Sequence, residues 1–286
     1  MEKLFEVTGG EGGSAFLLTG ATKTALVDCG MAYCAAALIG NIRRVLGERP
    51  LDYLLISHSH YDHIGAMPYL RQVWPDCRVV GAAYAKRILA KPSARRTIKD
   101  LGRQAAVLFG ADSIPPYADE LLGVDRVVGD GDLLDLGGMR IEVLATPGHT
   151  QCSLAFLAAG ETLFASESTG CMREDGRVYS AFITSFAQSA ASIIRCRARQ
   201  PRVIITPHFG RVRDSYLDSY WDRCLAAAVE TRRSILALAA QGLDERQILQ
   251  QYEEAARDES LEKAQPLMAF RLNAAAMIKT LLREAQ

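Results

Sequence analysis

One ten-residue stretch, residues 56–65, constrains this chain more than any other feature. It reads Ile-Ser-His-Ser-His-Tyr-Asp-His-Ile-Gly and continues an apolar run that begins at Leu51 and predicts a buried strand. Three imidazoles and one carboxylate therefore stand where a strand ends and a loop begins, at His58, His60, His63 and Asp62. In an extended backbone His58 and His60 point to the same side, and a turn at Tyr61 could redirect the next two residues. This cluster predicts a divalent-metal site, with a hydrogen-bonded polar loop as the weaker interpretation.

The other histidines of the chain also follow strand-like runs. The chain has five histidines, and the two outside the cluster are His149, in Thr-Pro-Gly-His-Thr, and His208, in Thr-Pro-His-Phe-Gly. An earlier strand candidate, Thr24–Asp28, ends in an aspartate. Every histidine is thus placed where a strand gives way to a loop, the position at which binding residues concentrate.

In this order, the motifs resemble those of the metallo-β-lactamase superfamily, over roughly the first 210 residues. The resemblance implies an α/β fold, a four-layer αβ/βα sandwich with a C-terminal helical addition. It also implies two divalent transition-metal ions per chain. Zinc is the expected metal, with iron and manganese as alternatives, because nitrogen and oxygen ligands do not choose among them. The family pattern assigns these ligands: His58, His60 and His149 to one metal, and Asp62, His63 and His208 to the other.

Glu167 departs from the family pattern. The family places a bridging aspartate after a strand beyond the third histidine, and the matching run here, Thr162–Ser168, has a glutamate. A glutamate is one methylene longer, so it could bridge both metals, bind only one, or change their spacing. A surface carboxylate after a strand is the weaker interpretation.

The resemblance implies a hydrolase. Two metals would lower the pKa of a shared water from 15.7 towards about 7, which makes a metal-bound hydroxide available near neutral pH. Asp62 is the candidate catalytic group that accepts a proton, because no histidine is left over for that role. We expect cleavage of an ester or thioester of a small molecule. Two alternatives stay open: a di-iron oxidoreductase with Glu167 as a metal-binding carboxylate, and a signalling protein that binds partners on the same fold.

We expect a catalytic domain over residues 1–210, with a helical insert at about 82–116, and a helical extension over 211–286. The insert reads as two helices broken at Pro92, and a helix at Ile64–Trp74 should begin just past the histidine cluster. The extension resembles those of glyoxalase II-like and quinolone-signal-response thioesterase-like relatives. It could pack on the core, form a lid, or make a dimer contact, and packing is the default.

Three helices are predicted in the extension, over Tyr216–Gln241, Asp244–Asp258 and Leu261–Glu284, with Pro266 near the start of the last. The apolar side chains expected to pack from the last helix are Leu267, Phe270, Leu272, Met277 and Leu281.

Substrate contacts give a weaker signal. The candidates are Tyr61, Arg95, Lys99, Arg173 and Tyr179, with Arg177 and Phe182 as further pocket residues. Arg95, Lys99 and Arg103 are spaced by four and share a helical face. The plainer interpretation of this stripe is a solvated helix face with no role in binding. The alternative is a cationic rim that attracts an anionic substrate.

Composition excludes some partners and suggests a compartment. The 33 basic and 33 acidic residues give a formal net charge of zero, which argues against binding to nucleic acid or an anionic membrane. The seven cysteines form no Cys-x-x-Cys pair and predict reduced thiols, and we expect Cys29, Cys152 and Cys171 to be buried structural residues. The first residues show no signal-peptide pattern, so we expect a cytoplasmic protein, with a homodimer as one arrangement that the tail allows.

Overall fold

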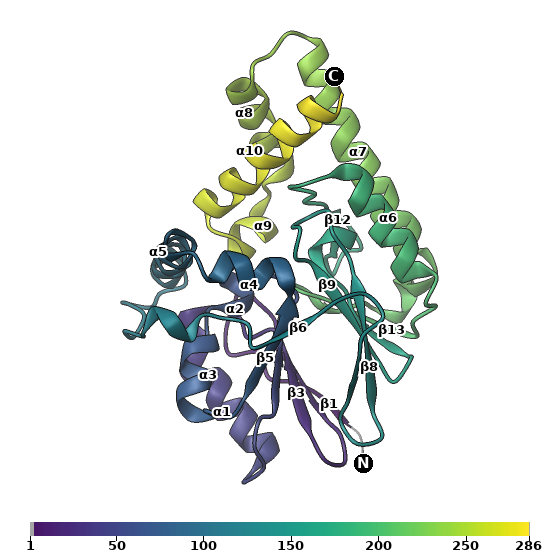
Figure 1. Ribbon diagram of the computed structural model, residues 1–286. Helices are drawn as coiled ribbons and strands as arrows, with labels where there is room; N and C mark the ends of the chain where they lie inside the picture. Colours follow the sequence, from purple (N-terminus) through teal and green to yellow (C-terminus); the bar gives the residue numbers. More distant parts are fainter. Residues whose placement is uncertain (1–2, 286) are drawn as a thin grey trace. The chain divides into compact units, whose positions relative to one another are not determined.

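The computed structural model describes residues 3–285, which fall into two compact units. The first comprises the described part of Met1–Ala145 together with Leu154–Phe164. The second comprises Thr146–Ser153 together with the described part of Ala165–Gln286. Figure 1 traces the chain through both. The division expected at residue 210 stays a prediction.

A six-stranded mixed sheet forms the centre of the first unit. Its strands follow the order of the chain: β1 (Lys3–Glu6), β2 (Phe16–Thr19), β3 (Thr24–Val27), β4 (Tyr53–Leu55), β5 (Arg78–Ala82) and β6 (Arg126–Val128). The pairs from β1 to β3 are antiparallel, and those from β3 to β6 are parallel. Because β3 and β4 are parallel neighbours, with Val27 opposite Leu55, the residues that follow both strands emerge at the same edge. That edge carries the histidine cluster.

A second, antiparallel sheet in the same unit has the strand order β10-β9-β8-β7. Its strands are β7 (Leu133–Asp135), β8 (Arg140–Ala145), β9 (Leu154–Ala158) and β10 (Thr162–Phe164). Every residue of β2, β3 and β9 is buried, as expected for strands covered on both faces. The rings of Phe16 and Phe164 lie 5.9 Å apart, so side chains of the two sheets meet in one core.

Helices make the crossovers that the parallel strands require. They are α1 (Ala35–Leu46), α2 (Tyr61–Ile64), α3 (Met67–Val73), α4 (Ala83–Leu89) and α5 (Pro92–Leu108), with 3₁₀ turns η1 (Ala32–Cys34) and η2 (Asp119–Leu121). The predicted break at Pro92 is confirmed, since this residue begins α5. The single helix predicted at 64–74 is wrong. The chain forms the one-turn α2 and then α3, so Asp62 and His63 lie inside a helix instead of before it.

The second unit is largely helical. Its helices are α6 (Phe186–Arg197), α7 (Tyr220–Ala240), α8 (Glu245–Ala256), α9 (Glu259–Ala264) and α10 (Leu267–Glu284), with 3₁₀ turns η3 (Glu167–Thr169) and η4 (Asp214–Ser219). Its short strands are β11 (Cys171–Met172), β12 (Val178–Tyr179), β13 (Val203–Thr206) and β14 (Gly210–Arg211). Helix α10 packs against α7 and α8, as Figure 1 shows. A buried apolar cluster that includes Phe182, Ile235 and Phe270 joins these helices. Within residues 3–285, none of the helices combines the length and apolar character needed to cross a bilayer.

The last predicted helix is divided in two. Gln265 adopts an extended backbone (φ −142°, ψ 130°) between α9 and α10, because a residue that precedes proline is disfavoured in the helical region. Pro266 therefore separates the two helices. The predicted packing residues also divide: Phe270, Met277 and Leu281 are buried, whereas Leu267 and Leu272 are 37% and 53% exposed. The prediction was wrong for these two, which lie on the solvent face of α10.

Candidate metal centre

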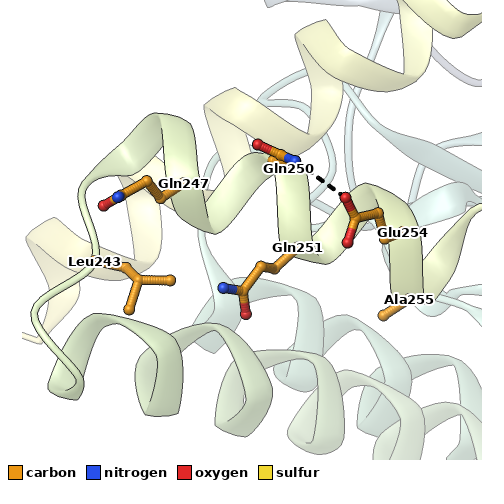
Figure 2. Close-up of a pocket in the computed structure, with 6 residues that line it drawn as sticks. All are labelled: Leu243, Gln247, Gln250, Gln251, Glu254 and Ala255. Carbon is orange, nitrogen blue, oxygen red and sulfur yellow. Dashed lines mark hydrogen bonds between the residues drawn. The ribbon is translucent and has the colours of Figure 1, made fainter.

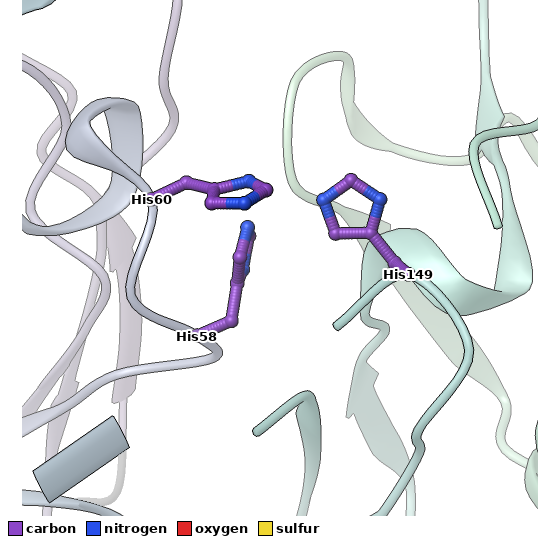
Figure 3. A group of neighbouring side chains, drawn as sticks. All are labelled: His58, His60 and His149. Carbon is purple, nitrogen blue, oxygen red and sulfur yellow. The ribbon is translucent and has the colours of Figure 1, made fainter. Parts of the chain in front are cut away.

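Four sequence-predicted ligands lie together in the first unit, and we call them the first-unit group: His58, His60, Asp62 and His63. His60 is the N-cap of α2, and its carbonyl accepts bonds from the backbone N–H of His63 (3.1 Å) and Ile64 (3.2 Å). This single helical turn supplies the redirection that the sequence predicted. The imidazole of His58 lies 4.5 Å from that of His60 and 4.1 Å from that of His63, centroid to centroid. Figure 3 shows His58 and His60 on their shared loop.

Asp28, directly after β3, fixes the protonation of two of these imidazoles. Asp28 Oδ2 lies 2.9 Å from His63 Nδ1 and accepts a 2.7 Å bond from Ser57 Oγ. A carboxylate only accepts, so His63 carries its proton on Nδ1. The single hydroxyl hydrogen of Ser57 is donated to Asp28. Ser57 Oγ therefore accepts a hydrogen bond from His58 Nδ1 at 3.0 Å. When neutral, both rings therefore hold their lone pair on Nε2, the tautomer that binds metals through this nitrogen.

Two close backbone approaches hold the first-unit group in place. Asp28 has φ +52°, an uncommon left-handed conformation, and its own N–H bonds Leu55 O at 2.9 Å. Gly65, which follows α2, leaves no room for a side chain. A Cβ there would lie 2.5 Å from the backbone nitrogen of Ala32. The glycine of the histidine motif thus allows α2 to lie against the turn that begins α1.

The second unit gathers the other three predicted ligands, His149, Glu167 and His208, which we call the second-unit group. His149 stands on a loop that touches α6 closely: a Cβ on Gly148 would lie 2.6 Å from the Cα of Ser189. Gly148 also has φ +139°, which side chains rarely adopt. The Pro-Gly-His motif is thereby explained by packing, because only glycine permits this contact.

Hydrogen bonds orient His149 as well. Its backbone N–H donates to Ser168 Oγ at 2.9 Å, and its Nδ1 lies 2.6 Å from the carbonyl oxygen of Ala181. A carbonyl only accepts, so Nδ1 carries a proton, and in the neutral tautomer Nε2 holds the lone pair. His149 is completely buried, and Figure 3 shows its ring on the loop that carries it.

Glu167 lies between the two histidines of its unit. Its Oε1 is 3.2 Å from His208 Nε2, and its Oε2 is 3.5 Å from His149 Nε2. The carboxylate is 6% exposed, which contradicts the weaker interpretation of a surface acid. Each carboxylate oxygen therefore faces a different imidazole.

The donor chemistry of both groups fits divalent metals. In the second unit, the Nε2 lone pair of His149 faces a carboxylate oxygen. In the first, the Nε2 lone pair of His63 faces Asp62 Oδ1 at 3.9 Å. Two acceptors at such distances repel unless a cation or an added proton lies between them. Ligands about 2.0–2.1 Å from a tetrahedral zinc stand about 3.4 Å apart, close to the 3.5 Å separation in the second unit. Within the first unit the candidate ligands are His58, His60, Asp62 and His63, and within the second they are His149, Glu167 and His208.

The predicted substrate residues lie in different settings. Tyr179 lines a small cavity beside Glu167 and His208. Burial, with smaller contributions from Tyr252 and Glu167, raises the pKa of Tyr179 well above its usual value, so its hydroxyl stays protonated. Tyr61 is buried in α2. Arg173 is 8% exposed and donates to both carboxylate oxygens of Asp258, at 2.7 and 2.6 Å.

The basic stripe on α5 is largely occupied by local partners. Arg95 Nε donates to the carbonyl of Leu89, and Lys99 bonds to Asp119 and lies 4.6 Å from the ring centre of Tyr117. Arg103 pairs with Asp100 at 3.1 Å. Arg95 and Lys99 are part-buried, whereas Arg103 is exposed. These contacts favour the plainer interpretation of the stripe.

Several residues around the second-unit group were not predicted from the sequence. The cavity beside Glu167 has a volume of about 10 Å³ and is also lined by Phe209, Leu261, Ala264 and Gln265. Pro266 was the one sequence signal for the residues at 261–265, because a proline disfavours helical backbone at the residue before it. A second, wider cavity of about 780 Å³ runs along α8 and is lined by other residues, which Figure 2 shows: Leu243, Gln247, Gln250, Gln251, Glu254 and Ala255.

The prediction of buried cysteines is confirmed, since all seven are buried. Burial raises the pKa of Cys29 well above its usual value and that of Cys77 to about 12. Such thiols are protonated at neutral pH and contribute as small apolar side chains.

Comparison with known proteins agrees with the motifs. The chain is 31% identical over 139 residues to a hydroxyacylglutathione hydrolase of Photobacterium profundum, which covers 46% of this chain and 40% of that protein. It is 27% identical over 161 residues to a metallo-beta-lactamase fold-containing protein of Sulfurisphaera tokodaii, covering 55% of this chain and 57% of that one. The chain thus spans about half the length of these curated relatives.

Solved structures share the fold along nearly the whole chain. A metallo-beta-lactamase family protein of Thermus thermophilus matches with a TM-score of 0.67 at 21% identity, covering 99% of this chain and 93% of that one. An archaeal superfamily protein of Sulfolobus tokodaii matches with a TM-score of 0.65 at 20% identity, covering 99% of both chains. The predicted α/β metallo-β-lactamase fold with added C-terminal helices is confirmed. The family model of the metallo-beta-lactamase superfamily matches residues 8–208, and the chain therefore belongs to that superfamily.

Proposed function

We propose that this protein is a dinuclear metal-dependent hydrolase that cleaves a thioester, or a related ester, of a small molecule. One observation carries the proposal: Glu167 directs one carboxylate oxygen to His149 and the other to His208. The family pattern places these two histidines on different metals. A glutamate between them is positioned to bridge both ions, as the family's aspartate does.

The ligands then divide as the resemblance implied. His58, His60 and His149 would hold one ion, and Asp62, His63 and His208 the other, with Glu167 between them. The short distances from Glu167 to His149 and His208 within the second unit support the assignment. Zinc is the metal we propose, since nitrogen and oxygen donors from histidine and carboxylate are its usual ligands.

The residues of the chain have distinct tasks in this reaction. When bound, two divalent ions would lower the pKa of water and polarise a carbonyl oxygen. Asp62 holds or accepts a proton beside the reacting water, because the histidines are engaged as ligands. Asp28 and Ser57 keep the Nδ1 protons of His63 and His58 in place. The protonated hydroxyl of Tyr179 can donate a hydrogen bond into the cavity beside Glu167.

The thioester class rests on the relatives. The Photobacterium protein is named a hydroxyacylglutathione hydrolase, and an acylglutathione is a thioester. We propose a thioester substrate for this chain, with its acyl and thiol parts left open.

The test is a screen with defined metals. Protein loaded separately with zinc, iron or manganese is assayed on thioesters, esters, lactones and phosphodiesters. We expect close to two ions per chain and the highest kcat/KM with thioesters. His60→Ala should lose metal and turnover together, whereas Gln250→Ala, on the exposed face of α8, should retain both. Full metal occupancy and unchanged melting in His60→Ala would refute the ligand assignment. Redox-active iron without hydrolysis would favour the oxidoreductase instead.

A further inference from the structure

The cavity beside Glu167 and His208 has one polar wall that the proposed reaction does not use, the side-chain amide of Gln265. Tyr179, Phe209, Leu261 and Ala264 supply rings and aliphatic groups to the same cavity. Binding sites of this kind combine apolar walls with a few polar groups that fix the orientation of the ligand. Gln265 is in the position of such an orienting group.

The backbone of Gln265 is held firmly. Its N–H donates to Leu261 O at 2.9 Å, and its carbonyl accepts from Arg257 Nη2 at 3.2 Å. Pro266 keeps it extended, as described above. Asp258, the N-cap of α9, is clamped by the buried Arg173, which anchors the helix that leads to Gln265. Gln265 therefore lines the cavity from a backbone that is fixed on both sides.

The side chain, in contrast, is not satisfied. Gln265 is 9% exposed, and its Oε1 is buried without a hydrogen-bond partner in the described part of the chain. Leaving a buried acceptor without a donor destabilises the folded protein. Such a cost is common at binding sites, where a ligand supplies the missing partner. The cavity of about 10 Å³ has room for about one water molecule, so a larger ligand must displace side chains of the α9 segment.

We propose that Gln265 is a specificity-determining residue whose Oε1 accepts a hydrogen bond from an N–H or O–H donor of the substrate, close to the group cleaved at the metals. The inference rests on the proposed function and narrows its substrate class. The preferred thioester carries a donor, such as a secondary amide N–H, within a few bonds of the sulfur or the carbonyl. A site with a buried acceptor discriminates against analogues that lack the donor, because they leave the acceptor unpaired.

The first arm of the test measures the free protein. Gln265→Met keeps the length of the side chain and removes the unsatisfied amide, so its Tm should rise by a few degrees. Gln250→Met, on the exposed face of α8, is the matched control and should leave Tm nearly unchanged. A lower Tm in Gln265→Met would show that the amide is already satisfied in the free protein, for example by a water, and would overturn the inference.

The second arm measures recognition of a single N–H. The probes are the thiols N-acetylcysteamine and N-acetyl-N-methylcysteamine, which can bind the zinc-loaded protein through sulfur and differ by one donor. Wild type should bind the N–H probe about three- to tenfold more tightly, and Gln265→Met should bind both equally. The wild-type ratio alone tests the inference, even if the variant does not fold.

The outcomes separate the inference from the proposed function. Acetyl thioesters of both thiols are assayed in parallel, and if neither is hydrolysed while the thiol preference holds, the thioester assignment fails and the role of Gln265 stands. Equal affinity of wild type for the two thiols overturns the role of Gln265, whatever the rate of hydrolysis. If Gln265→Met still binds the N–H thiol more tightly than the N-methyl thiol, another residue recognises the N–H. This result also overturns the role of Gln265.

Discussion

The two ligand groups are built in opposite ways. The first-unit group occupies six consecutive positions, 58–63, and needs only a strand end and one helical turn to assemble. The second-unit group is spread over positions 149–208 and comes together from three separate segments of the chain. The first group is therefore encoded locally. The second depends on contacts between segments distant in sequence, each of which must be ordered on folding.

This difference changes what supports each group. In the first unit, one carboxylate, Asp28, organises two histidines through bonds at the edge shared by parallel strands. In the second, His149 relies on a glycine contact with α6 and a carbonyl from the segment at Ala181. We expect the first-unit group to keep its geometry better than the second-unit group when residues elsewhere in the fold are substituted.

The largest expected effect is at the centre of the dispersed group. Glu167→Gln removes one anionic oxygen from between two histidines. Weaker metal binding and lost charge stabilisation should together lower kcat/KM on the order of 10⁴-fold. Glu167→Asp should be milder, because it restores the group that is usual in the family. Metal content by mass spectrometry and steady-state rates measure both, and normal occupancy and rate in Glu167→Gln would place this carboxylate away from the metals.

The next effect tests how strongly the second unit depends on its helical core. Phe270 is fully buried, so Phe270→Ala should destabilise folding by about 3–5 kcal/mol. Leu272 lies two residues away on the same helix but is 53% exposed, so Leu272→Ala should cost less than about 0.5 kcal/mol. Urea denaturation of the pair compares the two faces of α10. Equal losses would contradict the described packing.

A smaller effect is expected for the support of the local group. Asp28→Asn suits the left-handed backbone at this position, since asparagine tolerates it well. The variant weakens the acceptor for His63 and Ser57, and metal affinity should fall about 10- to 100-fold. Competition with a chelator gives the affinity. An unchanged value would show that the local group needs no partner beyond its own loop.

The smallest effect is a pH dependence in the helix that covers the cavity. Burial acts to raise the pKa of Asp258, but hydrogen bonds and charge from Arg173, with the N–H of Leu261 and the charge of Arg177, outweigh it and lower that pKa. The ionised carboxylate of Asp258 therefore stabilises the fold at pH values above the unfolded-state pKa of about 3.9. This stabilisation is lost as the pH falls through the lower pKa that Asp258 has in the folded protein.

Asp258→Asn keeps a good N-cap and removes the charge. At pH 7 its Tm should lie about 2–4 °C below that of wild type, because the partly exposed pair is worth about 1 kcal/mol. The difference in Tm between wild type and Asp258→Asn should shrink below about pH 4. The metal ligands titrate in both proteins, so their titration does not affect this difference. A difference that is constant from pH 7 to pH 3 would rule out the ion pair as its cause.

By itself, the sequence indicated the local histidine group and the strand ends that carry it, and the resemblance of its motifs to a known family implied the fold class. These features depend on only a few neighbouring residues: apolar runs, glycine turns and the spacing of His58–His63. They can therefore be recognised in the sequence without knowledge of the fold. The break at Pro92 was legible for the same reason. The positions of His149, His208 and Glu167 were found from the family motifs, and the distances between their atoms came from the structure.

Only the tertiary structure decided which side chains those local features bring together. It placed Asp28 beside His63, turned Leu272 to solvent, and paired Arg173, a predicted substrate contact, with Asp258. It also placed Gln265 in the cavity beside Glu167. The physical reason is that burial and partner choice depend on segments far apart along the chain, whose packing no short sequence window contains.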